Sequence, residues 1–300
     1  MKLRKKEKAN SNFYVLHYKK FLLLPLFLVI LAGVFISNAV SEDGTPIYRD
    51  ISLKGGLSAV ITTDSEVSVQ EFKTDLQKNF PQNSFAVSEI FEDGQRTGFI
   101  VDTDLGDREM FEFVGEYFEK EFVSGDDYVS NFISPSLSSA FFQDAVKVLI
   151  VSFVLMSLVV FLYFREKVPA GLVILSALFD LIVTIGVLNF LRFEVSVAGV
   201  GALLMLIGYS VDTDVLLTNR MVKEKDYHTP LVEKLSSAWK TGTLMTFTTL
   251  AAALTAIFLT NSEIIFEISF IIVIGLIVDY VSTWGSNAGF LYLWLEKKNQ

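Results

Sequence analysis

The chain has 300 residues, of which 51% are hydrophobic and only 20% are charged, so it is too apolar for a single soluble core and typical of a membrane-spanning protein. No cysteine is present, so no disulfide supports the fold. The charge is uneven: residues 41–138 hold 20 Asp and Glu against 7 Lys and Arg, a balance of −13, in a chain of net charge −9. This distribution argues against any nucleic-acid-binding role.

The first apolar run covers residues 21–40 and follows a basic stretch, residues 1–20, with seven Lys or Arg and one Glu. A run of about 20 apolar residues is long enough to cross the hydrocarbon core of a bilayer. It is long for the apolar region of a secretory signal, and no convincing small-x-small cleavage site follows Val40. We therefore predict a retained first span with its basic N-terminus in the cytoplasm.

Residues 41–138 show a mixture of strand and helix patterns. Strands are predicted at residues 57–63, 85–91 and 97–101, and helices at 67–80 and 107–122; the natural place for a last strand is 129–133. The sequence Glu-Asp-Gly-Gln at residues 92–95 is a hairpin turn signal. The order βαββαβ predicts an α+β sandwich of ferredoxin-like type. Its roughly 98 residues can bury one modest core.

Five further apolar windows follow, at residues 141–164, 169–191, 195–219, 242–260 and 264–295. The loops rich in Lys and Arg are expected inside the cell, and the turns almost free of them outside. Six spans with both termini in the cytoplasm satisfy every loop at once. We therefore expect a polytopic α-helical protein of the cell membrane, with residues 41–138 outside as one domain between the first and second spans.

Four aspartates within these windows need an explanation: Asp180, Asp212, Asp214 and Asp279. A charge at membrane depth costs roughly 2.5–3.5 kcal/mol on insertion scales, so such residues usually face a bundle interior, an ion path or a partner charge. We interpret all four as candidates for a proton or ion relay. A structural hydrogen bond is the alternative for Asp180, a hydrated surface position for Asp214, and a packing role for Asp279.

Helix geometry separates Asp212 from Asp214, because positions two apart point about 200° from each other. Asp212 shares its face with small residues that let membrane helices approach closely, at positions Gly201 and Gly208. We therefore expect Asp212 to face the bundle interior. Asp214 lies on the face of Ser210 and has the weaker claim to a functional role.

Several other polar residues have two interpretations. Lys240 stands at the start of the fifth span, just before the window at 242–260, and is either a charge partner of Asp212 or a side chain that extends to the interface. The threonines that follow it either bond back to their own helix or line a hydrated wall opposite Asp212. No set of metal ligands and no cofactor motif is visible, and both histidines, His17 and His228, lie in segments expected in the cytoplasm.

The tripeptide Lys54-Gly55-Gly56 lacks the spacing of a phosphate-binding loop, so it is interpreted as a tight backbone turn before the first strand.

Four sequence blocks carry a resemblance to a known family: ISLKGG at 51–56, ALFDLIVTIG at 177–186, GYSVDTDVLLTNR at 208–220 and NAG at 287–289 with Asp279. With one span, an external domain and five further spans, nearly the whole chain resembles SecF of the protein-export machinery, in the resistance-nodulation-division superfamily. The pattern is closer to archaeal than to bacterial members.

Two departures from the bacterial pattern concern the candidate residues. The bacterial motif Gly-Tyr-Ser-x-Asn-Asp would place its acid at Thr213, whereas the acids here flank that position. Asp212 instead matches the acid of the sister protein SecD, in its Val-Asp-Ala-Asn-Val-Leu run. Lys240 and Thr241 stand where bacterial SecF has an arginine.

The resemblance implies a transport protein without enzymatic activity that forms a SecD–SecF complex, assists the Sec protein-conducting channel and contacts unfolded exported polypeptide, with coupling to the proton gradient. Two alternatives remain open. One is a small superfamily exporter of hydrophobic compounds, which its single compact domain disfavours. The other is an assembly subunit whose acids only pack.

Overall fold

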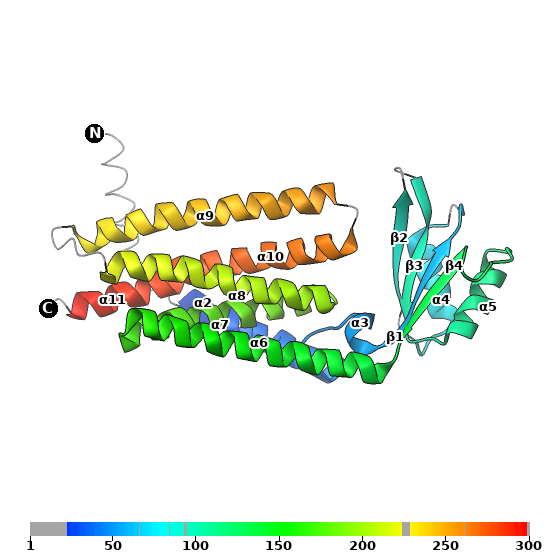
Figure 1. Ribbon diagram of the computed structural model, residues 1–300, viewed down its shortest axis with the longest axis horizontal. Helices are drawn as coiled ribbons and strands as arrows, with labels where there is room; N and C mark the ends of the chain where they lie inside the picture. Colours follow the sequence, from blue (N-terminus) through cyan, green and yellow to red (C-terminus); the bar gives the residue numbers. More distant parts are fainter. Residues whose placement is uncertain are drawn as a thin grey trace. The chain divides into compact units, whose positions relative to one another are not determined.

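The structure is a computed structural model that describes residues 23–65, 67–83, 85–92, 95–223, 229–260 and 262–298 (Figure 1). The basic stretch 1–20, both histidines and the centre of the turn at 92–95 lie outside the described residues. The chain divides into two compact units, a helical unit of Met1–Tyr48 with Lys147–Gln300 and a soluble unit of Arg49–Val146. Each is described by itself.

The soluble unit contains the elements α3 (Ile51–Lys54), β1 (Gly56–Thr62), α4 (Val69–Asn79), β2 (Phe85–Glu92), β3 (Gln95–Thr103), α5 (Asp107–Tyr117) and β4 (Tyr128–Ile133). Its four strands form one sheet in the order β2-β3-β1-β4, with every neighbouring pair antiparallel. After α3, the chain therefore follows the order β-α-β-β-α-β.

Period-two alternation decides which face of this sheet is buried. In β1 the side chains of Leu57, Ala59 and Ile61 are fully buried, and across the register they meet Val101 and Phe99 of β3. Helices α4 and α5 lie on the same side of the sheet (Figure 1) and add further apolar side chains to this core. Those that are fully buried are Phe72, Leu76, Met110 and Val114.

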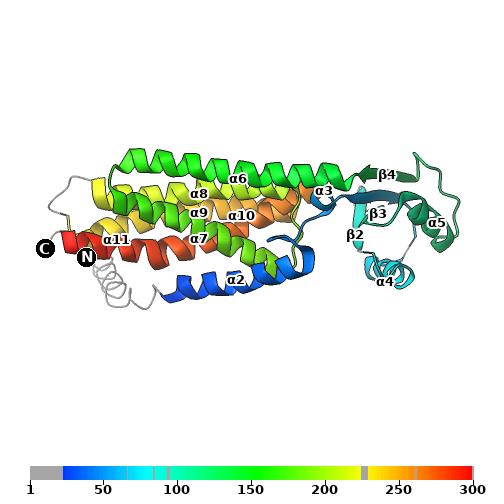
Figure 2. The same cartoon turned by 90° about the horizontal axis from the view of Figure 1, so that it is seen from below.

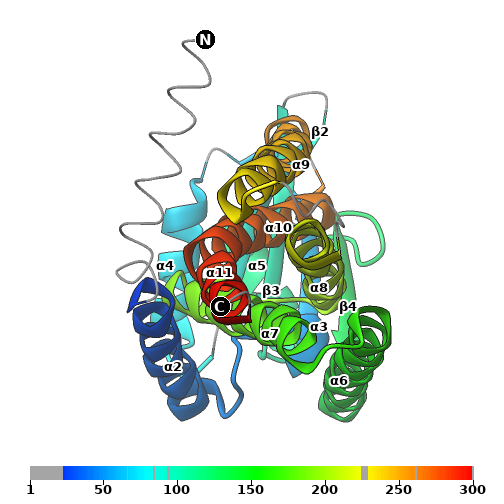
Figure 3. The ribbon, with the colours of Figure 1, turned by 90° about the vertical axis from the view of Figure 1, so that its left-hand side faces the viewer.

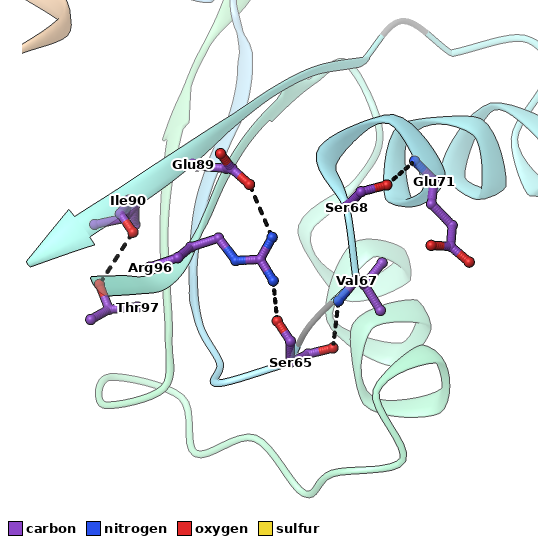
Figure 4. A network of polar contacts seen from close by, with 8 residues as sticks. All are labelled: Ser65, Val67, Ser68, Glu71, Glu89, Ile90, Arg96 and Thr97. Atoms are coloured by element: carbon purple, nitrogen blue, oxygen red, sulfur yellow. Dashed lines mark hydrogen bonds and ion pairs between the residues drawn. The ribbon is translucent and has the colours of Figure 1, made fainter. Parts of the chain in front are cut away.

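Arg96 ties the β2–β3 hairpin to the loop before α4 (Figure 4). Its guanidinium donates to the Glu89 carboxylate at 2.9 Å and to the backbone carbonyl of Ser65. In the same loop the Ser68 hydroxyl accepts a hydrogen bond from the Glu71 backbone N–H at 3.2 Å, which caps the start of α4. The helix cap at Ser68 and the hydrogen bonds of Arg96 therefore stabilise the loop before α4 against the β2–β3 hairpin.

The turn between α3 and β1 requires both of its glycines. Gly55 has φ 85° and Gly56 has φ 146°, conformations that side chains rarely adopt. A Cβ on Gly55 would lie 2.6 Å from the Cα of Pro135, and one on Gly56 would lie 2.5 Å from the carbonyl oxygen of Thr103. Close backbone approach therefore explains this glycine pair.

The helical unit contains helices long and apolar enough to cross a membrane, six in all among the described residues. Its elements are α2 (Leu23–Asp43), α6 (Pro135–Phe164), α7 (Lys167–Phe190), α8 (Val197–Thr218), η1 (Asn219–Lys223), α9 (Leu231–Leu259), α10 (Glu263–Ser282), η2 (Thr283–Asn287) and α11 (Ala288–Lys298). The symbol η marks a π-helical turn. The first part of α6 belongs to the soluble unit. Two helices start earlier than the apolar windows predict, at Pro135 rather than 141 and at Leu231 rather than 242. Each continues through polar residues back to a proline, Pro135 or Pro230, where helices commonly begin.

Figures 2 and 3 show α7, α8 and α10 at the centre of the helical unit, with α2, α6 and α9 around them. Burial agrees with this arrangement: 44% of the most apolar window of α7 and 50% of that of α8 lie inside, against 6% for α6 and 11% for α9. A polar side chain on an inner face of a central helix is therefore removed from both lipid and water.

The N-terminal ends of α8 and α10 are joined by a carboxylate. Glu267 of α10 accepts hydrogen bonds from the Ser196 backbone N–H at 2.7 Å and from its hydroxyl at 2.6 Å. Further along the same two helices, a Cβ on Gly275 would lie 2.4 Å from Cδ1 of Leu206, so the Leu206 side chain packs directly against this glycine. The two helices are thus tied at one end and pressed together near their middle.

Candidate functional site

Three aspartates from the three central helices are buried: Asp180 of α7, Asp214 of α8 and Asp279 of α10. Their exposed fractions are 1%, 0% and 0%. We name them, together with the polar side chains that contact them, the carboxylate cluster.

Asp214 has two donors from the segment that follows α10. The Asn287 side-chain amide donates to Oδ1 of Asp214 at 2.6 Å, and the Thr283 hydroxyl donates to the same oxygen at 2.9 Å. Thr283 also lies 3.3 Å from Oδ1 of Asp279. The donors stand at the two ends of the π-helical turn η2, a geometry that is frequent at functional sites.

Asp180 is held by a different set of hydroxyls. The Ser210 hydroxyl of α8 donates to its Oδ2 at 2.6 Å, which links α7 to α8. One turn before Asp180 on α7, the hydroxyl of Ser176 lies 3.0 Å from that of Ser282, which links α7 to α10. The cluster therefore connects all three central helices through side-chain hydrogen bonds.

Among the described residues, one oxygen of each carboxylate has no hydrogen-bond partner: Oδ1 of Asp180, Oδ2 of Asp214 and Oδ2 of Asp279. Within the described part of the chain, none of the three forms an ion pair with Lys, Arg or His. An ionised carboxylate that is buried without a cation is costly, and each such charge opposes the ionisation of its neighbours. This arrangement is chemically suited to hold and exchange protons.

Among the described residues, no group of three or more His, Cys, Asp or Glu side chains has the geometry to hold a metal ion. The donors that contact the carboxylates are hydroxyl and amide N–H groups.

The prediction that Asp212 faces the bundle interior is wrong for this chain. Asp212 is exposed, and a Cβ on either Gly201 or Gly208 would have no atom within 4 Å, so this face of α8 makes no close helix contact here. The hydrated surface position considered for Asp214 is also wrong, because Asp214 is fully buried. Since α8 is apolar on all sides, hydrophobicity did not indicate its inner face; the polar partners on α7 and η2 do.

Asp212 lines a cavity of about 200 Å³ between α8, α9 and α10. The other lining residues are Tyr209, Thr213, Met245, Thr246, Thr248, Thr249 and Leu276. The hydroxyls of Thr246, Thr248 and Thr249 donate to backbone carbonyls of their own helix, as the simpler interpretation expects. They nevertheless lie opposite Asp212. Lys240 is exposed on α9 and is not part of this lining.

Sequence reasoning missed Thr283 and Asn287 as partners of the acids. A signal for them exists, because Asp279, Thr283 and Asn287 follow one another at spacings of four and so share one side of a helix. Ser210 has the same spacing to Asp214, but its hydroxyl bonds to Asp180 on the neighbouring helix. Only the packing of the helices shows that second partner.

A family profile described as protein export membrane protein SecD/SecF, C-terminal, matches residues 114–297, which include the whole cluster. The protein-export membrane protein SecF of Methanocaldococcus jannaschii is 33% identical over 282 residues, 91% of this chain and 94% of that protein. The chain belongs to the SecF family. A second SecF, from Pyrococcus furiosus, is 31% identical over 93% of this chain and 92% of its own length.

Solved structures show the same fold. The crystal structure of SecDF, a translocon-associated membrane protein from Thermus thermophilus, matches 95% of this chain with a TM-score of 0.70 at 21% sequence identity. The chain spans 38% of that SecDF chain. A second SecDF structure, in the super-membrane-facing form, matches with a TM-score of 0.62. Membership of the SecF family makes this chain a multi-pass cell-membrane protein of the protein-export class.

Proposed function

We propose that the chain is the SecF subunit of a SecD–SecF complex that assists the Sec channel and acts on unfolded polypeptide as it leaves the membrane. The support is membership of the SecF family together with the likeness to SecDF, whose chain extends well beyond the part matched here. The loops rich in Lys and Arg favour cytoplasmic termini and residues 41–138 outside. On the outside, the sheet order β2-β3-β1-β4 favours a ferredoxin-like domain.

The observation that carries the mechanism is the carboxylate cluster: three buried acids on three helices, with no cationic partner among the described residues. Adding or removing a proton there changes the repulsion between Asp180, Asp214 and Asp279 and with it the preferred packing of α7, α8 and α10. A proton that crosses a 100 mV potential releases about 2.3 kcal/mol. That energy shifts a two-state equilibrium about fiftyfold, enough to drive a conformational cycle.

The three acids have different parts in this proposal. Asp214 accepts two donors on one oxygen, so its charge is the best supported of the three. Asp180 has one short donor, Ser210, whereas Asp279 shares the Thr283 hydroxyl, which lies 3.3 Å from it and 2.9 Å from Asp214. We assign the exchangeable proton to Asp180 and Asp279. Asp214 is assigned the negative charge that attracts this proton.

The test compares Asp214→Asn with Asp212→Asn, two substitutions two residues apart on the same helix. We expect Asp214→Asn to leave the complex assembled but to abolish the stimulation of export by the proton gradient, because the buried charge is gone. Asp212→Asn should retain most of the stimulation, because Asp212 is exposed. Export is measured in membrane vesicles with and without an uncoupler.

Unchanged stimulation in Asp214→Asn would exclude the cluster from coupling. If export also stays normal when Asp180, Asp214 and Asp279 are all replaced by Asn, the acids only pack and the chain is an assembly subunit. Recovery of the chain as a homo-oligomer without a second membrane subunit would contradict the SecD–SecF proposal itself.

A further inference from the structure

The sheet of the soluble unit has two edge strands, β2 and β4, and they differ in how they are protected. Exposed edges tend to pair with other chains, so proteins guard them with bulges, charges or proline. Strand β2 is guarded: its register with β3 shifts between Ile90 and Phe91, and Glu89 pairs with Arg96 at 2.9 Å. A second strand would find this edge irregular and charged.

Strand β4, Tyr128–Ile133, has none of these devices. Its sequence, YVSNFI, contains no charged residue and no proline. It pairs with β1 in unbroken register from Ile61↔Tyr128 to Gly56↔Ile133. Two apolar side chains on it are exposed, Val129 at 47% and Phe132 at 61%. This edge is regular, uncharged and partly apolar, which are properties that invite another strand.

The phase of the β1–β4 pairing shows which backbone groups face outward. The Thr62 N–H donates to the Asp127 carbonyl at 2.8 Å, so Thr62 and Asp127 form a hydrogen-bonded pair. Because such pairs alternate along an antiparallel ladder, Val129 and Asn131 also bond to β1, while Ser130 and Phe132 point away from it. No other described strand lies beyond β4.

Tyr128 differs from Ser130 and Phe132, because its backbone N–H and carbonyl are already hydrogen-bonded within a turn. Its N–H donates to the Val123 carbonyl at 3.3 Å, and its carbonyl accepts from the Gly125 N–H at 2.9 Å. The available edge is therefore short and is centred on Ser130 and Phe132.

The charge around this edge selects the occupant. Residues 41–138 carry a balance of −13, and Asp126 stands close to the start of β4, next to Asp127, which pairs with Lys120 at 3.0 Å. A second copy of the same domain would bring a like charge to the contact, which opposes pairing. An extended segment with Lys or Arg next to apolar residues satisfies both the charge and the exposed Phe132. We propose that the free edge of β4 pairs with such a segment of the unfolded polypeptide, which adds a fifth strand to the sheet.

This inference rests on the proposed function and names the site at which the client binds. Pairing through backbone groups suits a client whose sequence varies, because every extended chain presents the same N–H and C=O groups. The net negative charge of residues 41–138, with Asp126 close to β4, adds a preference for basic segments without demanding a particular sequence. The site therefore recognises conformation and charge.

The experiment uses the full chain with its membrane partner in vesicles and a secretory polypeptide stalled during export. The photo-cross-linker p-benzoylphenylalanine is placed at position 132 on β4 or, as the matched control, at position 91 on the other edge; both positions hold an exposed phenylalanine. We expect cross-links to the stalled polypeptide from position 132 and not from position 91. Exchange of the client's Lys and Arg for Glu should remove most of the product.

Two variants at one position separate strand pairing from general contact. Ser130→Pro removes the outward N–H, and proline is tolerated where an edge N–H faces away from the ladder. Ser130→Ala keeps that N–H and removes only the hydroxyl. We expect Ser130→Pro to lower the cross-link yield from position 132 about fivefold, the loss expected for one backbone hydrogen bond, and Ser130→Ala to leave it unchanged.

Cross-links from position 132 to the partner subunit, to a second copy of this chain or to nothing would overturn the inference, as would equal yields for Ser130→Pro and Ser130→Ala. The proposed function fails differently. If the chain has no part in export, its removal leaves export unchanged, whereas a true export subunit that lacks this site would affect export and yet give no client product at position 132.

Discussion

Acidic residues are placed in opposite ways in the two units of the chain. In the helical unit three aspartates are buried, and the described side chains that donate to them are hydroxyl and amide groups. In the described part of the soluble unit no Asp or Glu is fully buried, and several acids bond to basic or tyrosine side chains, such as Asp127 with Lys120 and Asp107 with Tyr128. Solvated acids create an electrostatic field that attracts oppositely charged partners. Buried acids have a high desolvation cost, so their presence indicates a functional role.

The cores of the two units differ in the same way. The core of the soluble unit is apolar and aromatic, with Phe72 in ring contact with Phe99, Tyr117 and Phe118. The stability of this core comes from the burial of apolar side chains, so it depends on how closely these side chains pack. The centre of the helical unit carries a hydrogen-bonded network whose stability depends on charge and proton occupancy. Substitutions in each unit should therefore have different consequences, and three predictions test that difference.

The largest effect is expected from Phe72→Ala, which leaves a cavity in the core of the soluble unit. Phe72 is fully buried, and removing a buried phenylalanine side chain costs about 3–5 kcal/mol. The soluble unit should become sensitive to protease in membrane vesicles at temperatures at which the parent is resistant. The control is Phe91→Ala, which removes a phenylalanine that is 53% exposed. Equal protease resistance of the two variants would contradict a shape-dependent core.

A smaller effect is expected from Asn287→Ala, which removes one of the two donors to Asp214. A hydrogen bond to a charged group contributes about 1.5–3 kcal/mol, so the charged state of Asp214 should lose support by that amount. We expect the complex to assemble and the pH dependence of gradient-stimulated export to shift. Ser286→Ala is the control, because the Ser286 hydroxyl donates only to the Ser282 carbonyl of its own helix. A pH profile that moves equally in both variants would assign Asn287 to packing alone.

The smallest effect is expected from Tyr128→Phe in the soluble unit. The Tyr128 hydroxyl donates to Asp107 at 3.0 Å, and losing such a bond costs about 1 kcal/mol. Burial, followed by the hydrogen bond to Asp107, raises the pKa of Tyr128 above its usual value of 10.0. Burial and Asp75 likewise raise the pKa of Tyr117 to about 12.

These tyrosines also give the soluble unit a pH dependence. Because the folded-state pKa lies above the unfolded one, the stabilisation is complete below pH 10 and is lost as the pH rises through the folded values. Denaturation of the soluble unit should therefore become easier between about pH 10 and 12, and less steeply so in Tyr128→Phe. An identical alkaline slope in the variant would remove Tyr128 from this account.

Much of the secondary structure could be predicted from the sequence. Each apolar window overlaps one long helical segment, because length and hydrophobicity alone define a span. In the soluble unit the alternation of strand and helix patterns agrees with the observed order. Helix ends were less accurate, since α6 and α9 continue through polar residues that a hydropathy window leaves out. The π-helical turns at Asn219 and Thr283 had no signal in hydropathy.

The site could be predicted only in part. Asp180 and Asp279 were recognised as candidates because a carboxylate inside a span is unusual whatever its neighbours are. The choice between Asp212 and Asp214 failed because small residues were taken to mark a helix contact, and the face that holds them is open here. The partners Ser210, Thr283 and Asn287 come from other turns or other helices. Their approach to the acids is a property of packing, which no single-helix pattern contains.

The tie at Glu267 and the contact between Gly275 and Leu206 have a mechanical consequence for α8 and α10. The first contact joins the N-terminal ends of the two helices. The second is a close packing contact one turn before Asp279. Both contacts lie on the N-terminal side of Asp214 and Asp279. We therefore expect a change of charge at Asp214 or Asp279 to displace the C-terminal parts of these helices, together with η2 and α11, more than their N-terminal ends.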